Sequence, residues 1–513
     1  MEKRNVYNVF AENAVKFNKK AFLSFEDKRY SYGESFGIVN RMARFMQSKG
    51  VKKGSKIVIM MGNSPEFVFS SLAVFACGAI LIPINTFFKG GEAAYIINDS
   101  ETGFIITNGG FSAVMDEVRM KCENIREIFS FDNSVAGALN FHENIDGLSK
   151  EKVQCDSDEK DTALFIYTSG TTGHPKGAML TYYNILENVE SFIPVVNAKS
   201  KDKFLVMLPM FHTYTFTTCI MLPVRLGASM IILASVMDMK KENFKKILLF
   251  QRPTFVLGVP QIYSALTKSP MPKWFIKLFY PIKIHISGGA PLPMEIFAQF
   301  KKKFGIPVME GYGLSEASPV VAFNPPKKQK QGTVGKALPG VSVKVVNEEE
   351  MEVPCGEVGE LIVKGPNVMQ GYWRMPKATD DAIKNGWLFT GDFAKIDEEG
   401  YITIVDRKKD LIIAKGMNVY PREVEEVIYT FPGVEAAAVI GIPSLELGEM
   451  IAAYIQVKEG ETVNEKELKA YLAKNLANFK LPRVIKIINN IPLTATGKVL
   501  KRELKEMVKD GRI

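Results

Sequence analysis

The sequence predicts an α/β protein with a large N-terminal domain, built of α/β sheet subdomains plus a β subdomain, and a small α+β C-terminal domain. Three observations support this fold class. The chain has 513 residues, too many for one ordinary domain. Apolar runs of strand length alternate with helical patterns over roughly the first 330 residues, which is typical of parallel sheets. Beyond that point, short alternating strands replace this pattern.

Seven short apolar runs bounded by turn residues are predicted to be buried strands. They cover residues 56–61, 79–84, 103–107, 163–167, 230–233, 255–259 and 282–287.

One segment, residues 67–88, carries no charge over 22 residues and is long enough to cross a membrane. We favour instead a helix that begins near Ser64 and ends at Gly78, followed by the strand at 79–84. Pro65 suits the first turn of a helix and Gly78 suits its end. A helix followed by a buried strand is typical of an α/β core.

The β subdomain is expected at about residues 330–408. Strands are predicted at 341–346 and 360–363, and a hairpin is predicted from strands at 393–397 and 401–406 joined by a turn. The charged run at 406–410 marks a domain boundary, so that the two domains would cover residues 1–408 and 409–513.

The C-terminal domain combines helical and strand patterns. A helix is predicted at 421–429, because proline stands at its start, and strands are predicted at 434–440 and 451–457. Residues 462–465, Thr-Val-Asn-Glu, match a capping box. We expect them to start a helix with leucines at helical spacing, namely Leu468, Leu472 and Leu476.

The composition is that of a globular protein, with 46% hydrophobic and 24% charged residues. The net charge of +9 fits a protein that handles polyanions or contacts an anionic membrane, and an ordinary solvated surface explains it equally well. No apolar segment follows the basic N-terminus, so no signal peptide is predicted. The cysteines lie far apart without a CxxC pair, which predicts reduced thiols in a cytosolic protein: Cys77, Cys122, Cys155, Cys219 and Cys355.

A tract of Thr, Ser, Gly and one Lys at residues 168–177 directly follows the apolar run 163–167. A loop of this kind after a strand can direct backbone N–H groups and hydroxyls at a phosphate, with Lys176 supplying charge. The kinase-type P-loop does not fit, because Pro175 stands where it needs glycine and Gly177 where it needs Ser or Thr. The sequence therefore predicts a different phosphate loop, and its alternative is a surface turn.

Residues 167–177 resemble the signature of the adenylate-forming superfamily, which comprises acyl-CoA synthetases, luciferases and peptide-synthetase adenylation domains. Further motifs follow in the order of that family, so that the resemblance covers nearly the whole chain. They are SGGAPL at 287–292, EGYGLSE at 310–316, TGD at 390–392, DRKKD at 406–410, KGMNVYP at 415–421 and PLTATGK at 492–498. The sequences at 310–319 and 405–410 look most similar to bacterial long-chain fatty acyl-CoA synthetases.

The resemblance implies a reaction in two steps with ATP, CoA and Mg²⁺. ATP would activate a carboxylic acid to an acyl-adenylate with release of pyrophosphate, and CoA would then take the acyl group with release of AMP. We expect a medium- to long-chain fatty acid as the substrate. An aryl acid, or transfer to a carrier protein, is the alternative. A P-loop phosphotransferase would instead release ADP, and no nucleic acid is expected as a partner.

The resemblance also implies roles for single residues. Thr168 and its neighbours would hold the β- and γ-phosphates, Glu316 would hold Mg²⁺, and Tyr312 would stack near adenine. Catalytic roles fall to Lys498, Glu316, His212 and Thr168. The implied contacts of nucleotide and CoA are Thr168, Ser169, Gly170, Thr171, Thr172, Lys176, Gly289, Ala290, Pro291, Glu310, Gly311, Tyr312, Gly313, Ser315, Asp392, Arg407, Lys409, Gly416, Met417, Asn418 and Lys498.

Asp392 and Arg407 flank the predicted hairpin, so its formation would make them neighbours able to meet one ribose. A structural salt bridge is the alternative. In the family, the lysine at the position of Lys498 drives adenylation, and a mobile C-terminal domain then rotates. Lys409 matches the hinge of that rotation, and 416–418 match the loop that lines the pantetheine tunnel afterwards.

Some expectations stay open at this point. Some luciferases and plant aryl-CoA ligases carry a lysine where this chain has Ile413, which counts against those branches. His212 matches a position near the acyl carboxylate, and a histidine packed in the core is the alternative. Phe216 is either a gate of the acyl tunnel or a core residue.

The acyl pocket is expected to be lined by residues 211–216, 259–263 and 288–292, which are apolar or small. No charged partner for a second carboxylate or an amino group is evident there, which disfavours dicarboxylates and amino acids.

The basic, aromatic segment 273–283 could rest on an anionic membrane. We favour a buried helix running into the strand at 282–287. Peripheral membrane contact and a homodimer are left open.

Overall fold

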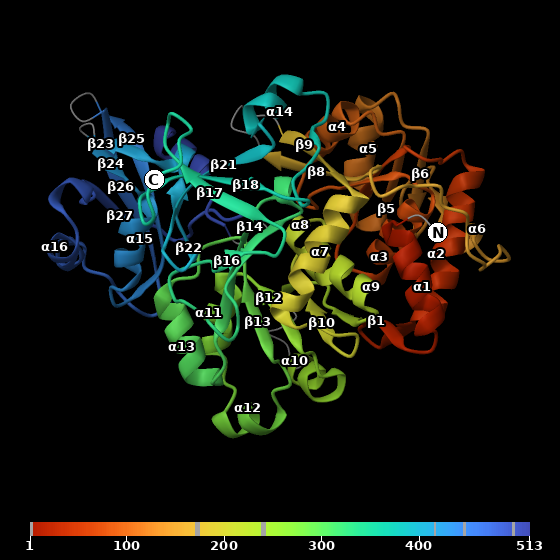
Figure 1. Ribbon diagram of the computed structural model, residues 1–513, viewed down its shortest axis with the longest axis horizontal. Coiled ribbons are helices and arrows are strands. Elements are labelled where there is room, and N and C mark those ends of the chain that lie inside the picture. The colour runs from red at the N-terminus through yellow and green to blue at the C-terminus, as the bar shows by residue number, and fades with distance from the viewer. Residues whose placement is uncertain (1–3, 170–174, 237–242, 415–416, 445–447, 495–497) are drawn as a thin grey trace.

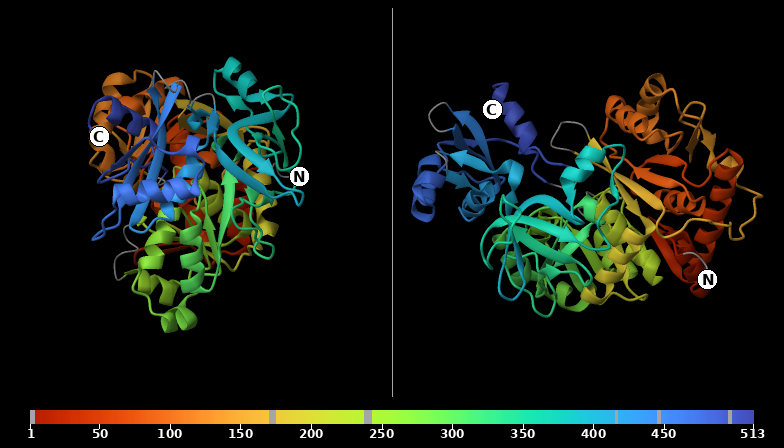
Figure 2. Two further views of the ribbon diagram at one scale, coloured as in Figure 1. Left: turned by 90° about the vertical axis from the view of Figure 1, so that its left-hand side faces the viewer. Right: turned by 45° about the horizontal axis from the view of Figure 1, so that its top comes forward.

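The computed structural model describes residues 4–169, 175–236, 243–414, 417–444, 448–494 and 498–513. Four β-sheets and the helices around them make up this part of the chain. Figures 1 and 2 show the C-terminal sheet at one end of the molecule, beside the β subdomain, with the N-terminal elements at the other end. The predicted α/β class is confirmed. The five cysteines are all free.

An eight-stranded sheet leads into the predicted phosphate loop. The spatial order of its strands is β19 (Gly371–Tyr372), β9 (Pro175–Thr181), β8 (Thr162–Ser169), β4 (Ile80–Pro83), β3 (Lys56–Met60), β5 (Phe104–Thr107), β6 (Glu127–Ser130) and β7 (Leu139–Asn140). In this order, the six strands from β8 to β7 are parallel, and β9 pairs antiparallel with β8.

A nine-stranded sheet carries the other large part of the site. The spatial order of its strands is β16 (Lys336–Ala337), β15 (Val320–Phe323), β14 (Val308–Gly313), β13 (Ile284–Ser287), β12 (Phe255–Gly258), β10 (Lys203–Val206), β11 (Ser229–Ile232), β1 (Ala21–Phe25) and β2 (Lys28–Ser31). In this order, the six strands from β14 to β1 are parallel, and β15 pairs antiparallel with β14.

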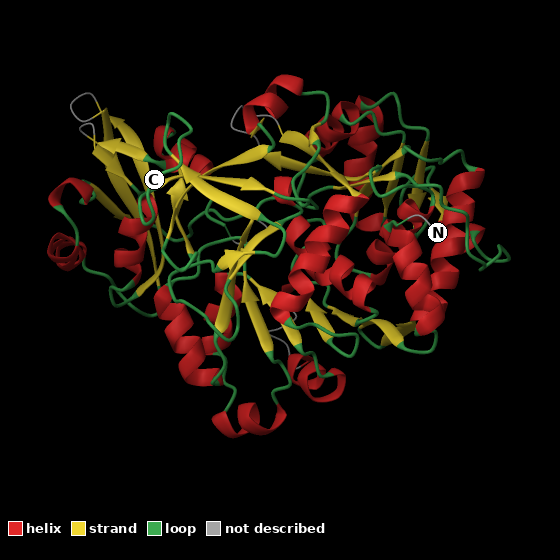
Figure 3. Cartoon of the chain, viewed as in Figure 1, coloured by secondary structure: helices red, strands yellow, loops and turns green. Residues whose placement is uncertain are grey.

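Helices fill the space between the two large sheets and cover their outer faces, as Figure 3 shows. In β3, Ile57 and Ile59 face the central core while Val58 and Met60 face the outer one, because side chains alternate along a strand. Buried on both faces, the strands appear in the sequence as continuous apolar runs.

The central layer contains α1 (Val6–Lys16), α2 (Tyr32–Ser48), α3 (Pro65–Ala76), α7 (Tyr182–Val196), α8 (Thr213–Thr215), the π-helical segment η2 (Phe216–Met221) and α9 (Leu222–Leu226). Helices α4 (Gly90–Asp99) and α5 (Ser112–Lys121) cover the eight-stranded sheet. The outer face of the nine-stranded sheet carries α10 (Asn243–Lys246), η4 (Ile247–Gln251), α11 (Pro260–Lys268), α12 (Lys273–Phe279) and α13 (Met294–Phe304).

The uncharged segment 67–88 forms a helix and a strand, as predicted. The Ser64 side chain accepts a hydrogen bond from the Phe67 backbone and caps α3, and Pro65 occupies its first position. Gly78 has φ +66° just after the helix, and β4 follows. Within the described ranges, no helix is long and apolar enough to cross a membrane.

The β subdomain is a five-stranded antiparallel sheet that contains the predicted hairpin. It consists of β17 (Ser342–Val346), β18 (Gly359–Lys364), β21 (Trp387–Ile396), β20 (Ile383–Lys384) and β22 (Ile402–Arg407), with β22 paired to β21. Helix α14 (Pro376–Ala382) lies beside it.

In its described residues, the C-terminal unit is a five-stranded sheet with three α-helices. Its strands are β24 (Met417–Val419), β23 (Ile412–Ala414), β26 (Gly448–Val457), β25 (Val434–Ser444) and β27 (Val484–Ile487), and its helices are α15 (Pro421–Tyr429), α16 (Glu465–Asn475) and α17 (Lys501–Lys509). The division of the chain into domains at 408 and 409 stays a prediction.

Two local predictions are wrong. Helix α16 is capped by Asn464, whose side chain accepts hydrogen bonds from Lys466 and Glu467, so the predicted capping box at Thr462 does not form. Asparagine is as good a cap and stands nearer to the helix. The helix at 273–279 is not buried, because Ile276 is its only buried residue, and the following strand starts only at Ile284.

Candidate active site

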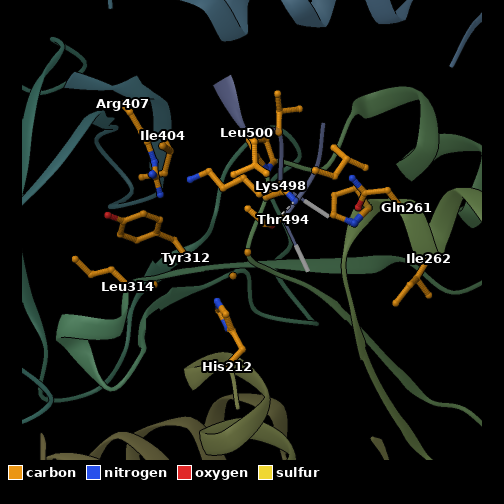
Figure 4. Close-up of a pocket in the computed structure, with 18 of the residues that line it drawn as sticks. His212, Gln261, Ile262, Tyr312, Leu314, Ile404, Arg407, Thr494, Lys498 and Leu500 are labelled. Carbon is orange, nitrogen blue, oxygen red and sulfur yellow. Dashed lines mark hydrogen bonds between the residues drawn. The ribbon is translucent and has the colours of Figure 1, made fainter. Parts of the chain in front are cut away.

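A cavity of about 1770 Å³ lies where the phosphate strand, the end of β14, the β21–β22 hairpin and the loop with Lys498 come together. Figure 4 shows His212, Tyr312, Arg407 and Lys498 around it, each from a different element. The predicted residues that line it are Thr168, Lys176, His212, Gly289, Ala290, Pro291, Glu310, Gly311, Tyr312, Gly313, Ser315, Glu316, Asp392, Arg407, Lys409 and Lys498.

The remaining predicted residues do not line the cavity or cannot be placed. Gly170, Thr171, Thr172 and Gly416 lie outside the described residues. Ser169 is the last residue of β8, where it pairs with Pro175. Met417 and Asn418 are exposed on β24 and are not among the residues that line the cavity.

Glu316 is held in place by two hydroxyl groups. Thr168 Oγ1 donates to Glu316 Oε1 at 3.2 Å, and Tyr372 Oη donates to the same oxygen at 3.0 Å. Burial and the Glu316 charge raise the pKa of Tyr372, so its hydroxyl stays protonated as a donor. Lys176 Nζ lies 5.2 Å from the centre of the Tyr372 ring. This arrangement brings a carboxylate and a lysine together beside the phosphate strand.

Sequence reasoning missed Tyr372. It reaches Glu316 because β19 pairs antiparallel with β9, with Tyr372 opposite Ala178. A contact between strands so far apart in the chain leaves no local pattern in the sequence.

The β21–β22 hairpin brings Asp392 and Arg407 together, as predicted. The two residues are directly opposite in the register, with 3.7 Å between Arg407 Nε and Asp392 Oδ1. Tyr312 Oη donates to Asp392 Oδ2 at 2.5 Å. Asp392 is buried, so these partners fix its carboxylate at the cavity wall. A carboxylate of this kind can accept hydrogen bonds from a pair of hydroxyls.

Lys498 lines the cavity, and two hydrogen bonds connect it to Thr494. The Thr494 backbone donates to the Lys498 carbonyl at 2.7 Å, and the Lys498 backbone donates to Thr494 Oγ1 at 3.0 Å. Burial and the nearby positive charge of Arg407 lower the pKa of Lys498 to about 7. A cation that is costly to bury without a partner suits a site that receives an anionic ligand.

His212 faces the same space. It caps the short helix α8, and its Nδ1 accepts a hydrogen bond from the Tyr214 backbone at 3.2 Å. Burial and the charge of Lys498 lower its pKa to about 4, so the ring is neutral at pH 7. Thr213, the next residue, shares a 3.0 Å hydrogen bond with Ser315. This bond joins α8 to the loop that carries Glu316.

Glu310 lies at the boundary with the C-terminal unit. Its Oε1 accepts a hydrogen bond from the Leu292 backbone at 3.1 Å, and burial raises its pKa to about 7. Asp406, at the end of β22, also lines the cavity and accepts from the Arg422 backbone at 2.8 Å. Asp406 therefore ties the first turn of α15 to the hairpin.

Further contacts connect the C-terminal unit to the rest of the chain. Lys268 on α11 and Glu435 on β25 form an ion pair at 3.2 Å. At the boundary itself, Lys408 pairs with Glu360 of the β subdomain at 2.8 Å, and the adjacent Lys409 lines the cavity, where burial lowers its pKa.

An apolar arm of the cavity extends along α11. Of the predicted acyl-pocket residues, 211–213, 260–262 and 289–291 line the cavity. The arm continues to Leu266, Met271, Val236, Phe244 and Ile296. Lys245 and Lys268 also line it, so the predicted lack of charged groups is only partly met.

Phe216, whose role as a tunnel gate or a core residue the sequence left open, is a core residue. It is fully buried between the two large sheets, where its ring lies 6.3 Å from that of Phe75, and it does not line the cavity.

Two sequence profiles match the chain. One, described as "AMP-binding enzyme", matches residues 10–373, and its companion, "AMP-binding enzyme C-terminal domain", matches residues 423–498. The chain belongs to the AMP-binding enzyme family. Its predicted class, an AMP-forming acid–thiol ligase, is confirmed, and so is the resemblance to the adenylate-forming superfamily.

Known proteins resemble the chain over most of its length. A long-chain-fatty-acid–CoA ligase of Bacillus subtilis is 34% identical, over 98% of this chain and 94% of that protein. A feruloyl-CoA synthase of Amycolatopsis is 32% identical, over 93% of each chain. The solved structure of ATP-bound MatB from Rhodopseudomonas palustris is 31% identical with a TM-score of 0.89, over 99% of this chain and 100% of that one.

Proposed function

We propose that this enzyme activates a medium- to long-chain fatty acid with ATP and transfers the acyl group to CoA. The observation that carries this proposal is one continuous cavity that joins Lys498, Glu316 and the Asp392–Arg407 pair to the apolar arm along α11. The polar part suits a nucleotide triphosphate and a carboxylate, and the apolar part suits an alkyl chain.

The first step joins the acid to AMP. A carboxylate oxygen of the fatty acid attacks the α-phosphorus of ATP, and the bond to the pyrophosphate oxygen breaks. Lys498, in its charged form, would neutralise the carboxylate and the α-phosphate as they approach each other. Thr168 and Lys176 would hold the outer phosphates, and Asp392 would accept hydrogen bonds from the ribose. Catalysis would rest on positioning and charge neutralisation.

Mg²⁺ fits the residues present. A hard cation of this kind is usually held by one or two carboxylates together with substrate phosphates. Glu316 offers a carboxylate fixed by two hydroxyls at the cavity wall. Among the residues that the structure places, no three His, Cys, Asp or Glu side chains form a cluster, so Glu316 would share the ion with ATP. The ion would neutralise phosphate charge.

The second step needs a different arrangement of the C-terminal domain, which we place at residues 409–513. The thiolate of CoA attacks the acyl carbonyl carbon, and the bond to the AMP oxygen breaks. Met417 and Asn418 lie outside the cavity, so rotation about Lys409 would be required to bring their loop to it. In the first step, before the adenylate forms, His212, neutral at the cavity wall, would contact the acyl carboxylate.

The decisive test is substrate-dependent ATP–pyrophosphate exchange over a panel of acids, namely acetate, octanoate, palmitate, cinnamate and a long-chain dicarboxylate. We expect octanoate or palmitate to give the highest kcat/KM. Preference for acetate, cinnamate or the dicarboxylate would contradict the assignment of the acyl substrate, and the dicarboxylate arm tests Lys245 and Lys268 directly.

Lys498→Ala is the matching variant. We expect exchange to fall by about 10²-fold or more, because a positioned charge at the reacting phosphate is lost. Comparing CoA with acyl carrier protein as the acceptor separates the two transfer reactions. Unimpaired exchange in Lys498→Ala would remove this lysine from the first step.

A further inference from the structure

Helix α12 stands out on the surface of the molecule. It projects from the outer face of the nine-stranded sheet, at the bottom of Figure 1 and of the left view in Figure 2. Trp274 is 62% exposed and Leu278 is 66% exposed, while Ile276 is the only buried residue of the helix. Large apolar side chains therefore face away from the protein.

The spacing along α12 separates two faces. Trp274 and Leu278 are four residues apart and share one face, whereas Ile276, two residues from each, points toward the core. Lys273 and Lys277, both exposed, flank the outer row on one side, and the exposed Phe279 extends it on the other. The outward face of a helix in water is normally polar. We call Lys273, Trp274, Lys277, Leu278 and Phe279 the α12 face.

The charge of this region is one-sided. From residue 243 to residue 294 the sequence has seven Lys or Arg and no Asp or Glu. Helix α13 packs against α12, ends in three lysines at 301–303, and carries its single acid, Glu295, in its first turn. Lys268 is paired with Glu435, but the other six basic residues of this stretch have no acid beside them in the sequence between 243 and 294, and this excess of positive charge complements an anionic partner.

The α12 face also adjoins the cavity. Ser269, Pro270 and Met271 line its apolar arm, and α12 begins two residues after Met271. An apolar substrate taken from a bilayer would enter this arm beside the helix; this connection rests on the proposed function, whereas the docking surface itself does not.

We propose that the α12 face docks reversibly on the surface of an anionic lipid bilayer. Tryptophan and phenylalanine prefer the boundary between acyl chains and headgroups, and lysines are attracted to anionic headgroups. Seven residues are too few for a helix that crosses the bilayer, and their small apolar area suits a peripheral and reversible contact.

Co-sedimentation of the full chain with vesicles tests the electrostatic part. One set of vesicles is pure phosphatidylcholine, and the other is an equimolar mixture with phosphatidylglycerol. We expect binding to the anionic vesicles only. The variant Lys273→Glu/Lys277→Glu should bind at least tenfold more weakly, since each lysine near the surface contributes about five-fold. The control Lys466→Glu/Lys474→Glu on α16 makes the same charge change at exposed positions and should bind like the native protein.

The apolar part is tested by Trp274. We expect its fluorescence to shift to the blue on anionic vesicles, a shift that is lost in Trp274→Phe. The variant Trp274→Ala should bind more weakly, whereas Met120→Ala, which alters another exposed apolar residue (78% exposed) on α5, should not.

Three results would overturn the proposal. One is equal binding of the α12 and α16 charge variants. Another is equal binding to neutral vesicles. The third is a dimer in lipid-free light scattering that Lys273→Glu/Lys277→Glu dissociates, since that would assign the face to a second copy of the chain. ATP–pyrophosphate exchange in detergent-free solution should stay within about twofold in this variant, because its substitutions lie outside the cavity lining. If the native protein shows no ATP–pyrophosphate exchange with any acid of the panel, that result would count against the proposed function and not against the docking surface.

Discussion

Glu316 shows at the residue scale how the site is prepared for its ligands. Both hydroxyls that contact it, from Thr168 and Tyr372, donate to the same oxygen, Oε1. Partners of this kind fix the orientation of a ligating carboxylate before a metal ion arrives, and their loss commonly weakens metal binding.

Tyr372→Phe removes one of these donors and keeps the ring. We expect the Mg²⁺ concentration for half-maximal exchange to rise by about tenfold, with little change in stability. A Mg²⁺ titration at saturating ATP measures this. Tyr312→Phe is the matched control, because it removes the donor to Asp392 and should raise the KM for ATP instead. Identical Mg²⁺ curves for native protein and Tyr372→Phe would contradict the positioning role.

The lowered pKa of Lys498 predicts a pH dependence. The lysine acts as a cation, and its pKa of about 7 in the free enzyme means that the charged fraction falls as the pH rises through 7. Hence kcat/KM for ATP should fall above pH 7, whereas the decline in kcat should lie at higher pH, because bound phosphates favour the charged lysine. Initial rates of ATP–pyrophosphate exchange at varied ATP concentration across pH 6 to 9 would show this. A pH-independent kcat/KM above 7 would contradict it, and Lys498→Arg, which stays charged, should lack the decline.

Different signals revealed different residues of the site. Asp392 and Arg407 could be paired from the sequence because a short hairpin makes its two ends neighbours. Lys498 and Glu316 were assigned through their motifs, because no local pattern connects residues so far apart in the chain. Tyr372 could not be found in either way, since its role arises from the pairing of β19 with β9.

At the scale of elements, the buried strands were the most predictable part of the fold. β3, β4 and β12 each appear as a short, mostly apolar run near turn residues, because both of their faces are covered. The predicted burial of α12 failed for the opposite reason. Its apolar residues resemble those of a core helix, and only its position at the edge of the molecule shows that they are exposed.

Gly391, in β21 beside Asp392, has φ +70°, and a methyl group in place of its α-hydrogen would have no atom within 4 Å beyond its two chain neighbours. Gly391→Ala would therefore meet strain of the backbone without a clash, costing about 1–2 kcal/mol. We expect that loss in the free energy of unfolding, measured with urea, together with a higher KM for ATP.

Gly54→Ala is the control for that variant. Gly54 has φ +77° and the same open surroundings, but it lies in the connection before β3. It should lose similar stability with an unchanged KM. Equal KM values for both variants would show that the conformation at Gly391 does not position Asp392.

At the scale of the whole molecule, the two predicted sets of C-terminal residues lie in different places. Lys498 lines the cavity, whereas Met417 and Asn418 are exposed outside it. The observed arrangement therefore suits the first step of the proposed reaction and not the second.

Holding this arrangement in place should separate the two steps. Lys268 and Glu435 face each other across the two units at 3.2 Å. A Cys355→Ser background removes the exposed native thiol. In this background, the two cysteines of the variant Lys268→Cys/Glu435→Cys can be cross-linked with a short bis-maleimide. We expect ATP–pyrophosphate exchange to persist and acyl-CoA formation to fall by about tenfold or more. The two single-cysteine variants, treated alike, control for the modification itself. Full acyl-CoA formation by the joined protein would contradict rotation of the domain.

The order of strands in the large sheets could not be predicted from the sequence. β1 pairs with β11 and β4 pairs with β8, each across a long stretch of chain. The predicted elements are compatible with many such orders, and packing between distant helices selects one of them.

The β21–β22 hairpin also limits how the length of the chain can change. Its turn lies at the end far from Asp392 and Arg407, and Asp397 accepts hydrogen bonds there from the Glu399 and Tyr401 backbones. A residue inserted within β22 would move Arg407 to the opposite face of the sheet, because side chains alternate along a strand. Residues inserted at 398–400 would leave the register at Asp392 unchanged. This turn is therefore the place to attach a fluorescent label that reports on the nucleotide pocket without altering it.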